Sequence, residues 1–309
     1  MDSKRVSLGF LSMEQKFSSK KMEHRSSGRR EIVDIHTTKS RKKGLAGLFE
    51  GFVRTFRNFG FALILLPITL IALLCMGVSA VPGMYLYHIV DKATDGYPLF
   101  LMLVCKGLSL SAGYFLYGIT LIFLVPLVNK ILPLRLRPWR GNWYSLQTIP
   151  WYYHNALTYI VRFTFLDFVT PGPLNILFFR MMGMKIGKGV MINTTYISDP
   201  ALITLEDFVT IGGSATIFAH YGQKGILILS PVVIKRGATI GLKASIMGDV
   251  VVGEGVVVPA HSALLPKTRV PDHAKFVVPA QQWKAPQHES SEDSSEADRS
   301  NETKDKESA

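Results

Sequence analysis

The stretch IKRGATIGLKASIMGDVVVGEGVVVPAHSALLPKTRV, residues 234–270, places an aliphatic residue at every sixth position. These positions are Ile234, Ile240, Ile246, Val252, Val258, Leu264 and Val270, and an earlier run with the same spacing consists of Leu205, Ile211 and Ile217. No α-helix repeats every six residues. A solenoid of short repeats does, because each repeat stacks one apolar side chain on the next along a shared core. The repeat therefore predicts a parallel β-solenoid.

The predicted solenoid runs from about residue 186 to about residue 270. It opens with the hexads IGKGVM and INTTYI, and a register slip precedes Leu205. The segment 173–184, PLNILFFRMMGM, is expected to cap its first coil, because an open solenoid end exposes core. Between Ile217 and Ile234 the repeat lapses. The intervening FAHYGQKGILILSPVV is too long for a corner of the coil, and we interpret it as an excursion.

Two long stretches of the N-terminal half lack Asp, Glu, Lys and Arg, namely residues 58–90 and 107–129. About 20 apolar residues suffice to cross a hydrocarbon core, so residues 58–130 are predicted to form a transmembrane helical hairpin. Basic residues flank both outer ends, whereas the connecting DKATDGY (residues 91–97) is slightly acidic. This pattern favours a multi-pass protein with both termini and the solenoid in the cytoplasm. Burial of the hairpin inside a soluble core is the alternative.

The formal net charge of +12 is concentrated beside the apolar segments: residues 1–57 hold fourteen Lys and Arg against six acids. Because no recognised binding module accompanies this charge, membrane lipids are the expected partner and nucleic acid is not. We expect residues 1–57 to be mostly disordered, with residues 40–60 as an amphipathic surface helix or a solvated linker. The acidic tail 284–309 is also predicted to be disordered.

Residues 131–184 are rich in Trp, Tyr and Arg, a mixture favoured at membrane interfaces. The apolar segment 151–170 is long enough to suggest a third span. Arg162 and Asp167 would be costly at the bilayer centre, however. We therefore expect interfacial helices, interrupted at Pro171 and Pro173, and a third span stays open as the alternative.

The chain gives no sign of a metal site. Its two cysteines, Cys75 and Cys105, lie inside the apolar segments without metal-ligand spacing. A zinc site in a β-helix would need three converging histidines, and His220 has no companion histidine in its excursion. We expect no metal cofactor.

Four segments of residues 185–283 carry a resemblance to a known family. They are ALITLEDFVTIGGSATIFAH (201–220), SPVVIKRGATIG (230–241), LLPKTRVPD (264–272) and FVVPAQQW (276–283). Together they resemble the hexapeptide-repeat acyltransferases, and within them the sugar O-acetyltransferases. A membrane hairpin joined to such a repeat is also similar to the terminal domains of poly-amino-acid synthetases. Thr239, Val277 and Thr268 depart from the family's Trp, Gly and exit Lys.

The resemblance implies a left-handed parallel β-helix with three short strands in each turn of eighteen residues. It also implies a homotrimer with an acyl-CoA, most simply acetyl-CoA, in a groove between neighbouring helices. The family's catalytic histidine corresponds to His220, as a general base that takes a proton from the attacking hydroxyl or amine. By contrast His261, inside an uninterrupted hexad, is expected to face outward.

The resemblance extends to binding residues. It implies that Asn193 and Asp199 bind the acceptor, although both residue types also suit coil corners. Gly241, Ala260 and Ser262 would let the pantetheine arm approach the backbone, with ordinary repeat packing as their alternative role. Lys267 and Arg269, with Lys275, would meet the phosphates.

The function predicted from these features is a membrane-anchored acyltransferase. It would transfer an acyl group from CoA to a hydroxyl or amine of a sugar, lipid-linked or small-molecule acceptor. One alternative is a peptide-bond-forming module that takes its aminoacyl thioester from a carrier protein. Another is a non-catalytic β-helix scaffold.

Overall fold

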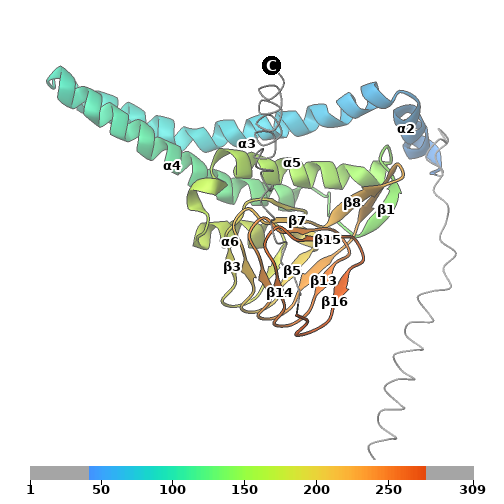
Figure 1. The fold of residues 1–309 in the computed structure, drawn as a ribbon. Coiled ribbons are helices and arrows are strands. Elements are labelled where there is room, and N and C mark those ends of the chain that lie inside the picture. The colour runs from blue at the N-terminus through green and yellow to red at the C-terminus, as the bar shows by residue number, and fades with distance from the viewer. Residues whose placement is uncertain (1–41, 276–309) are drawn as a thin grey trace, which may run out of the picture. The chain divides into compact units, whose positions relative to one another are not determined.

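The computed structural model describes residues 42–275, in which long helices precede a solenoid of short strands (Figure 1). The helices are α2 (Gly44–Thr55), α3 (Arg57–Ala93), α4 (Leu99–Ile131), α5 (Ile149–Thr164) and α6 (Pro173–Met181). Three short 3-10 turns are η1 (Leu146–Thr148), η2 (Leu166–Val169) and η3 (Pro200–Leu202). Predictions for residues 1–41 and 276–309, the N-terminal arm, Val277 and the acidic tail, lie outside the described residues.

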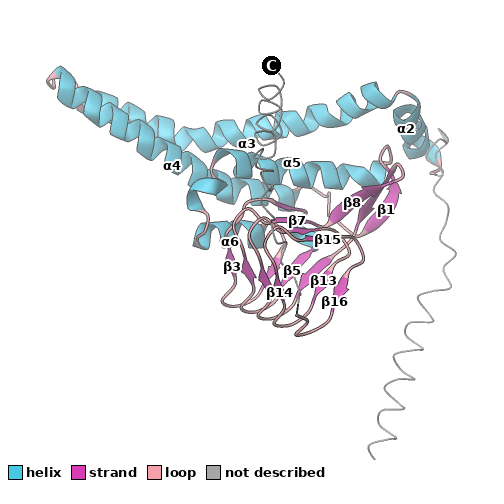
Figure 2. Ribbon diagram, viewed as in Figure 1, coloured by secondary structure: helices cyan, strands magenta, loops and turns pink. Residues whose placement is uncertain are grey.

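Three parallel sheets of very short strands form the solenoid (Figure 2). The first face contains β2 (Lys185–Ile186), β5 (Ile203–Leu205), β10 (Val232–Ile234), β13 (Val251–Val252) and β16 (Arg269–Val270). The second contains β3 (Met191–Ile192), β6 (Thr210–Ile211), β11 (Thr239–Ile240) and β14 (Val257–Val258). The third contains β4 (Ile197–Ser198), β7 (Thr216–Phe218), β12 (Ser245–Ile246) and β15 (Ala263–Leu264). The predicted fold class, a left-handed parallel β-helix behind a helical N-terminal part, is confirmed.

Each hexad of the sequence is one face of the coil. On the second face Ile240 pairs in register with Ile211 on one side and Val258 on the other. On the third face Ile246 lies between Ile217 and Leu264 in the same way. All of these but Leu264, at 6%, are wholly inaccessible to solvent. The aliphatic positions read from the sequence thus form three columns, whose burial supplies the main stabilising free energy of this region.

The corners between faces use a left-handed backbone. The residue three positions after an inward aliphatic has positive φ at Lys243 (53°), Asp249 (64°), His261 (60°) and Lys267 (72°). L-residues adopt this conformation only singly and at some cost, which fits an isolated sharp turn. The side chain of such a corner residue can point away from the core. His261 accordingly is exposed, and its predicted outward orientation is confirmed.

The register slip predicted before Leu205 has a structural cause. Ile192 and Ile197 are consecutive inward residues of the second and third faces. After Ile197 the chain turns at Asp199, whose φ is 60°, and forms η3 before β5 begins. Ile192 and Ile197 are five positions apart, and the inserted 3-10 turn then places Leu205 eight positions after Ile197, so the hexad spacing fails across this corner.

The predicted excursion is a β-hairpin made of β8 (His220–Gln223) and β9 (Ile226–Leu229). A third antiparallel strand, β1 (Trp139–Asn142), pairs with the other edge of β9. Only helices were predicted between residues 131 and 184, so β1 is a correction to that expectation. Its four residues carry little intrinsic strand signal, and their partner β9 lies far along the chain.

α3 and α4 are both long and apolar enough to cross a membrane. They touch where Gly83 faces Gly113, since a Cβ on Gly83 would lie 2.7 Å from the Gly113 carbonyl oxygen. Small residues allow such close approach of apolar helices. In the most apolar window of each helix, 17% and 33% of residues are buried. Most of the apolar surface of α3 and α4 is therefore exposed, whereas the soluble-core alternative requires it to be buried.

The segment 151–170 does not form a long apolar helix. α5 has sixteen residues, about 24 Å at 1.5 Å per residue, and ends at Thr164. Its polar side chains meet the β-helix: Asn155 donates to Asp199 over 2.7 Å, and the Tyr159 and Ser198 hydroxyls are 2.9 Å apart. The third-span alternative is therefore wrong for the described structure. Farther upstream, residues 44–55 form the helix α2 and not an extended linker, and Leu45 and Leu48 of this helix are exposed.

Two adjacent valines of β14 provide a test of the columns. Val258 is fully buried and Val257 is 59% exposed. We expect Val258→Ala to lower the free energy of unfolding by about 1.5–3 kcal/mol, because two methyl groups leave a packed core. Val257→Ala should change it by less than about 0.5 kcal/mol. Denaturant unfolding of the detergent-solubilised protein measures both, and equal losses would contradict the stacked core.

Candidate active site

His220 is the first residue of β8, where the chain leaves the third face of the coil. Its Nδ1 lies 2.5 Å from Oδ2 of Asp199. Asp199 occupies the left-handed corner before η3, and its side chain is fully buried. The insertion that disturbs the hexad spacing therefore brings a carboxylate beside the histidine.

The other oxygen of this carboxylate is held by α5. The Asn155 side-chain amide donates to Asp199 Oδ1 over 2.7 Å, and to the Trp151 carbonyl over 3.1 Å. A buried carboxylate is costly unless its oxygens accept hydrogen bonds. Here Oδ1 of Asp199 accepts from Asn155 and Oδ2 accepts from His220. These hydrogen bonds hold the carboxylate in place and, through it, the imidazole.

Aromatic rings confine the imidazole on its other sides. The Trp151 ring is 5.1 Å from the His220 ring, centre to centre, with the planes at 72°. The Phe218 ring is 5.6 Å away. The His220 side chain remains 20% exposed. The ring is therefore held in place yet reachable from outside.

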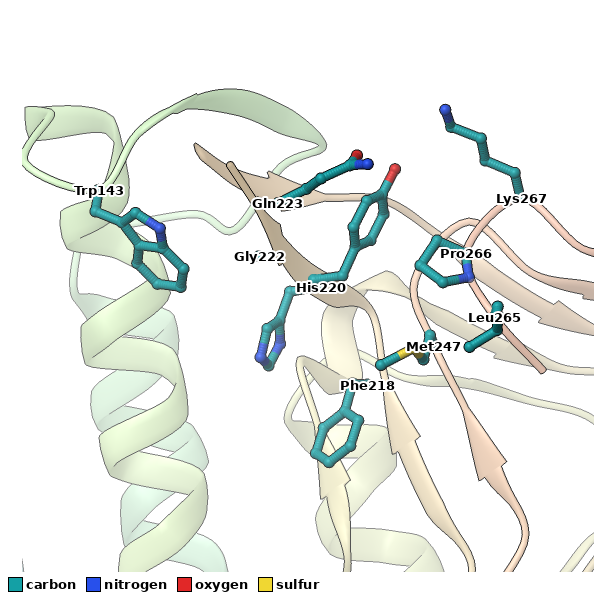
Figure 3. A pocket seen from close by; sticks show the side chains of 10 residues that line it. Trp143, Phe218, His220, Gly222, Gln223, Met247, Leu265, Pro266 and Lys267 are labelled. Carbon is teal, nitrogen blue, oxygen red and sulfur yellow. The ribbon is translucent and has the colours of Figure 1, made fainter. Parts of the chain in front are cut away.

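His220 opens onto a cleft of about 610 Å³ (Figure 3). Trp143 lies on one side of β8, which contributes His220, Tyr221 and Gln223 to the lining. The opposite wall consists of corners that follow β12 and β15, and it contributes Met247 and the run 265–267. A cleft of this size is typical of sites for small molecules.

A second pocket of about 420 Å³ shares Tyr221, Gln223 and Lys267 with this cleft. Arg140 of β1 and Lys224 of the β8–β9 turn complete its charged lining, and we call it the cationic pocket. Within residues 42–275, no carboxylate forms a salt bridge with these three cations. The pocket is therefore suited to an anionic group such as a phosphate.

The structure brings together some of the residues singled out in the sequence. His220 and Asp199 are hydrogen-bonded, and Lys267 lines the cleft beside them. Asn193 is exposed at the end of β3, on the second face. Arg269 instead forms an ion pair with Asp249 at 2.5 Å.

The three small residues predicted to contact pantetheine lie elsewhere. Gly241, Ala260 and Ser262 stack at the corner between the second and third faces, where a Cβ on Gly241 would overlap the backbone of Ala260. His220 lies beyond the other end of the third face. Within one chain these residues therefore do not share a cleft with His220.

Sequence reasoning missed Asn155, Trp151 and Arg140. Asn155 precedes its partner Asp199 by 44 positions, in a different kind of element. No spacing rule connects such residues, because a tertiary contact alone brings them together. Lys224 did lie within the predicted excursion, but its role there could not be read from the repeat.

A second histidine, His154, is buried behind the site in α5, with 2% of its surface exposed. Its Nδ1 lies 3.2 Å from Oδ1 of Asn129. Burial lowers the pKa of His154 to about 4, and the nearby Asp199 opposes this shift. The ring is therefore neutral at physiological pH. No cluster of metal-binding side chains occurs among residues 42–275.

The hydrogen bond between His220 and Asp199 determines which ring nitrogen can accept a proton. With Nδ1 bound to Asp199, Nε2 is the ring nitrogen left to accept a proton from a molecule in the cleft. The carboxylate fixes the tautomer and stabilises the imidazolium that forms. This is the constellation of a general base.

Comparisons with known proteins agree with the resemblance in outline. No protein-family model matches the chain. The delta-poly-L-ornithine synthetase of Acinetobacter baumannii (strain AB307-0294) is 29% identical over 96 residues. The match covers 31% of this chain and 7% of that protein, so this chain corresponds to a small part of its relative.

Among solved structures, the serine acetyltransferase of Neisseria gonorrhoeae is 18% identical, with a TM-score of 0.27 and coverage of 67% of this chain and 77% of that one. The serine acetyltransferase of Brucella abortus strain S19, solved in complex with coenzyme A, is 16% identical, with a TM-score of 0.28 and coverage of 61% and 62%. Each comparison is thus a distant or partial similarity, to serine acetyltransferases in the solved structures and to a poly-amino-acid synthetase in sequence.

His154 predicts a pH dependence of stability. Its ordinary pKa near 6.5 applies in the unfolded chain, while the folded value is about 4. Between these values the unfolded state binds more protons, so His154 makes stability fall as the pH decreases from 6.5 to 4, by up to about 1.4 kcal/mol per pH unit. Unfolding midpoints at pH 7 and pH 5 should therefore differ less in His154→Gln than in wild type. His261→Gln, at an exposed corner, should keep the wild-type difference.

Proposed function

We propose that this protein is a membrane-anchored acyltransferase that moves an acyl group from an acyl-CoA thioester to a hydroxyl or amine. The observation that carries the proposal is the imidazole of His220, held at Nδ1 by a buried carboxylate and opening onto a cleft. The second support is the cationic pocket that joins this cleft.

In the proposed reaction, Nε2 of His220 takes the proton of the acceptor as the acceptor oxygen or nitrogen attacks the thioester carbonyl. The tetrahedral intermediate then collapses by breaking the carbon–sulfur bond. The departing sulfur receives the proton from the imidazolium, so CoA leaves as its thiol and the base is regenerated. Asp199 stabilises the transient positive charge, and Asn155 keeps Asp199 oriented. We therefore assign Asp199 an orienting role, because its carboxylate is fully buried, in place of direct acceptor binding.

The donor phosphates fit the cationic pocket. CoA carries several anionic phosphate oxygens at the end remote from the thioester, and Arg140, Lys224 and Lys267 offer positive charge that forms no salt bridge among residues 42–275. Asn193 stays a proposed acceptor contact. Gly241, Ala260, Ser262 and Arg269 stay proposed donor contacts, and in the proposed homotrimer they would belong to the groove between two subunits.

The membrane anchor is part of the proposal. α3 and α4 would span the bilayer, with both termini and the β-helix on the cytoplasmic side, since the basic residues flank the outer ends of the hairpin. Confinement to the membrane raises the effective concentration of the site towards an acceptor that is confined there too. This favours a lipid-linked or lipid acceptor.

A second candidate uses the same histidine with a different donor. The partial similarity to a poly-amino-acid synthetase favours a module that forms peptide bonds from an aminoacyl thioester on a carrier protein. His220 would then deprotonate an attacking amine. Labelled acetyl-CoA and a carrier-bound aminoacyl thioester, offered in parallel, separate the candidates, because only one donor should label a product.

The proposed base is tested by graded substitutions. Membranes of the source organism that contain the protein should transfer label from acetyl-CoA to an extractable product. We expect His220→Ala to lower this rate by about 10²–10⁴-fold, because general base catalysis is lost. Asn155→Ala should cost on the order of tenfold, the equivalent of one hydrogen bond to a charged group.

His261→Ala is the matched control, since it removes an exposed histidine from the same β-helix. Its rate should equal that of wild type. Full activity in His220→Ala would remove the catalytic proposal and leave the scaffold alternative.

The cationic pocket is tested through the donor. We expect Lys267→Gln to raise the KM for acetyl-CoA about tenfold and to leave kcat near wild type, because a phosphate contact acts equally on ground and transition states. Added salt should weaken wild-type binding more than variant binding. An unchanged KM in Lys267→Gln and Arg140→Gln together would place the phosphates elsewhere.

A further inference from the structure

The segment that follows α4 surrounds a separate pocket of about 500 Å³. Three cations line it: Lys130 from the last turn of α4, then Arg135 and Arg137. Its remaining lining is apolar, and comprises Ile131, Leu132, Pro133 and Pro150. None of these residues lines the cleft or the cationic pocket of the candidate active site.

Arg135 and Arg137 lie on the same, exposed side of the segment that follows α4. From residue 132 to 137 burial alternates: Leu132, Leu134 and Leu136 are half-buried, whereas Pro133, Arg135 and Arg137 are exposed. Leu132 and Leu136 pack against the hydrophobic core. The leucines therefore anchor the segment, and the guanidinium groups are presented together rather than on a freely moving loop.

These cations lack acidic partners. Within residues 42–275, other basic side chains form ion pairs, such as Arg54 with Glu50 and Lys235 with Asp272. No carboxylate of that range forms a salt bridge with Lys130, Arg135 or Arg137. Three neighbouring positive charges repel one another, so an anion bound among them is favoured. Guanidinium groups bind phosphate oxygens in pairs, which makes a phosphate the best match.

The position of the pocket identifies the source of the phosphate. It lies at the end of α4, whose outward apolar residues include Leu127 at 52% exposure and Ile131 at 71%. Where the exposed apolar surface of a spanning helix ends, lipid headgroups begin. The apolar lining would contribute nothing to the binding of a free phosphate, whereas the acyl chains of a phospholipid would pack against it.

We propose that Lys130, Arg135 and Arg137 form a binding site for the phosphate of an acidic phospholipid headgroup. This inference rests on the membrane position given to α4 under the proposed function, and is independent of acyl transfer. The site would fix the height of the β-helix at the membrane surface, because the same segment leads directly into β1 and Arg140 of the cationic pocket.

The test uses the full chain, purified in detergent and given equal amounts of phosphatidylglycerol and phosphatidylcholine with identical acyl chains. Native mass spectrometry measures the ratio of the two bound lipids. We expect wild type to retain phosphatidylglycerol preferentially, and the double variant Arg135→Gln/Arg137→Gln to lower the ratio at least tenfold. Arg135→Lys/Arg137→Lys should restore part of the preference, because charge remains without the paired guanidinium geometry.

Lys92→Gln is the matched control, an exposed lysine at the far end of α3 that also lacks an ion-pair partner among the described residues. It should keep the wild-type ratio. Equal ratios in wild type and the double glutamine variant, or an equal loss in Lys92→Gln, would overturn the site. Displacement of phosphatidylglycerol by millimolar inorganic phosphate would overturn the lipid assignment in favour of a free anion. The double variant should keep the wild-type rate of acyl transfer, because the phospholipid site and the candidate active site share no residue.

The variants are expected to fold, because both arginines are exposed and form no salt bridge within the described part of the chain. A wild-type unfolding temperature checks this directly. Should the double variant unfold early, Lys130→Gln alone gives the same comparison at another lining residue of the pocket, with an expected severalfold loss of the lipid preference.

Discussion

The columns of aliphatic side chains inside the β-helix are the constraint on which the rest of this structure depends. Each strand of the coil is only two or three residues long and could not persist alone. It is held because an inward aliphatic residue, such as Ile240 in β11, lies between equivalent residues of the coils before and after it. Buried small residues such as Ala215 and Ala244 complete the core, and every corner must return the chain to the same register.

Two interruptions of this regular coil form the candidate active site. η3 lengthens one corner, and the β8–β9 hairpin leaves the coil one turn later. They place Asp199 and His220 next to each other where the chain leaves the third face, at the corner that Asp249 and Lys267 occupy in later coils. The hydrogen-bonded pair of Asp199 and His220 is therefore found where the repeat is interrupted. α5 then completes that position by donating from Asn155 to the buried carboxylate.

The basic residues divide according to their surroundings. Some of those on the coil are paired with carboxylates of other turns, as Lys235 is with Asp272 and Arg269 with Asp249, so their charge is locally balanced. Those between α4 and β1 and at the tip of the β8–β9 hairpin have no such partners among residues 42–275, and they line two concave surfaces. Two groups of basic side chains without salt-bridge partners among residues 42–275 thus lie where anionic ligands are proposed to bind, one at the end of an apolar helix and one beside the histidine.

The sequence by itself determined the β-helix, its columns, the excursion and the two long apolar helices. Each of these follows from a local or strictly periodic pattern, which a single chain displays without further information. The hexads located His220 as well, because it stands where the repeat stops. The partners of His220 depend instead on tertiary structure: Asn155 and Trp151 come from a helix far upstream, and β1 forms only by pairing with β9. Such contacts join elements of different periodicity, and no spacing along the chain encodes them. For the same reason Asp199, read in the sequence as an acceptor contact, is seen only in the fold to be buried against the imidazole.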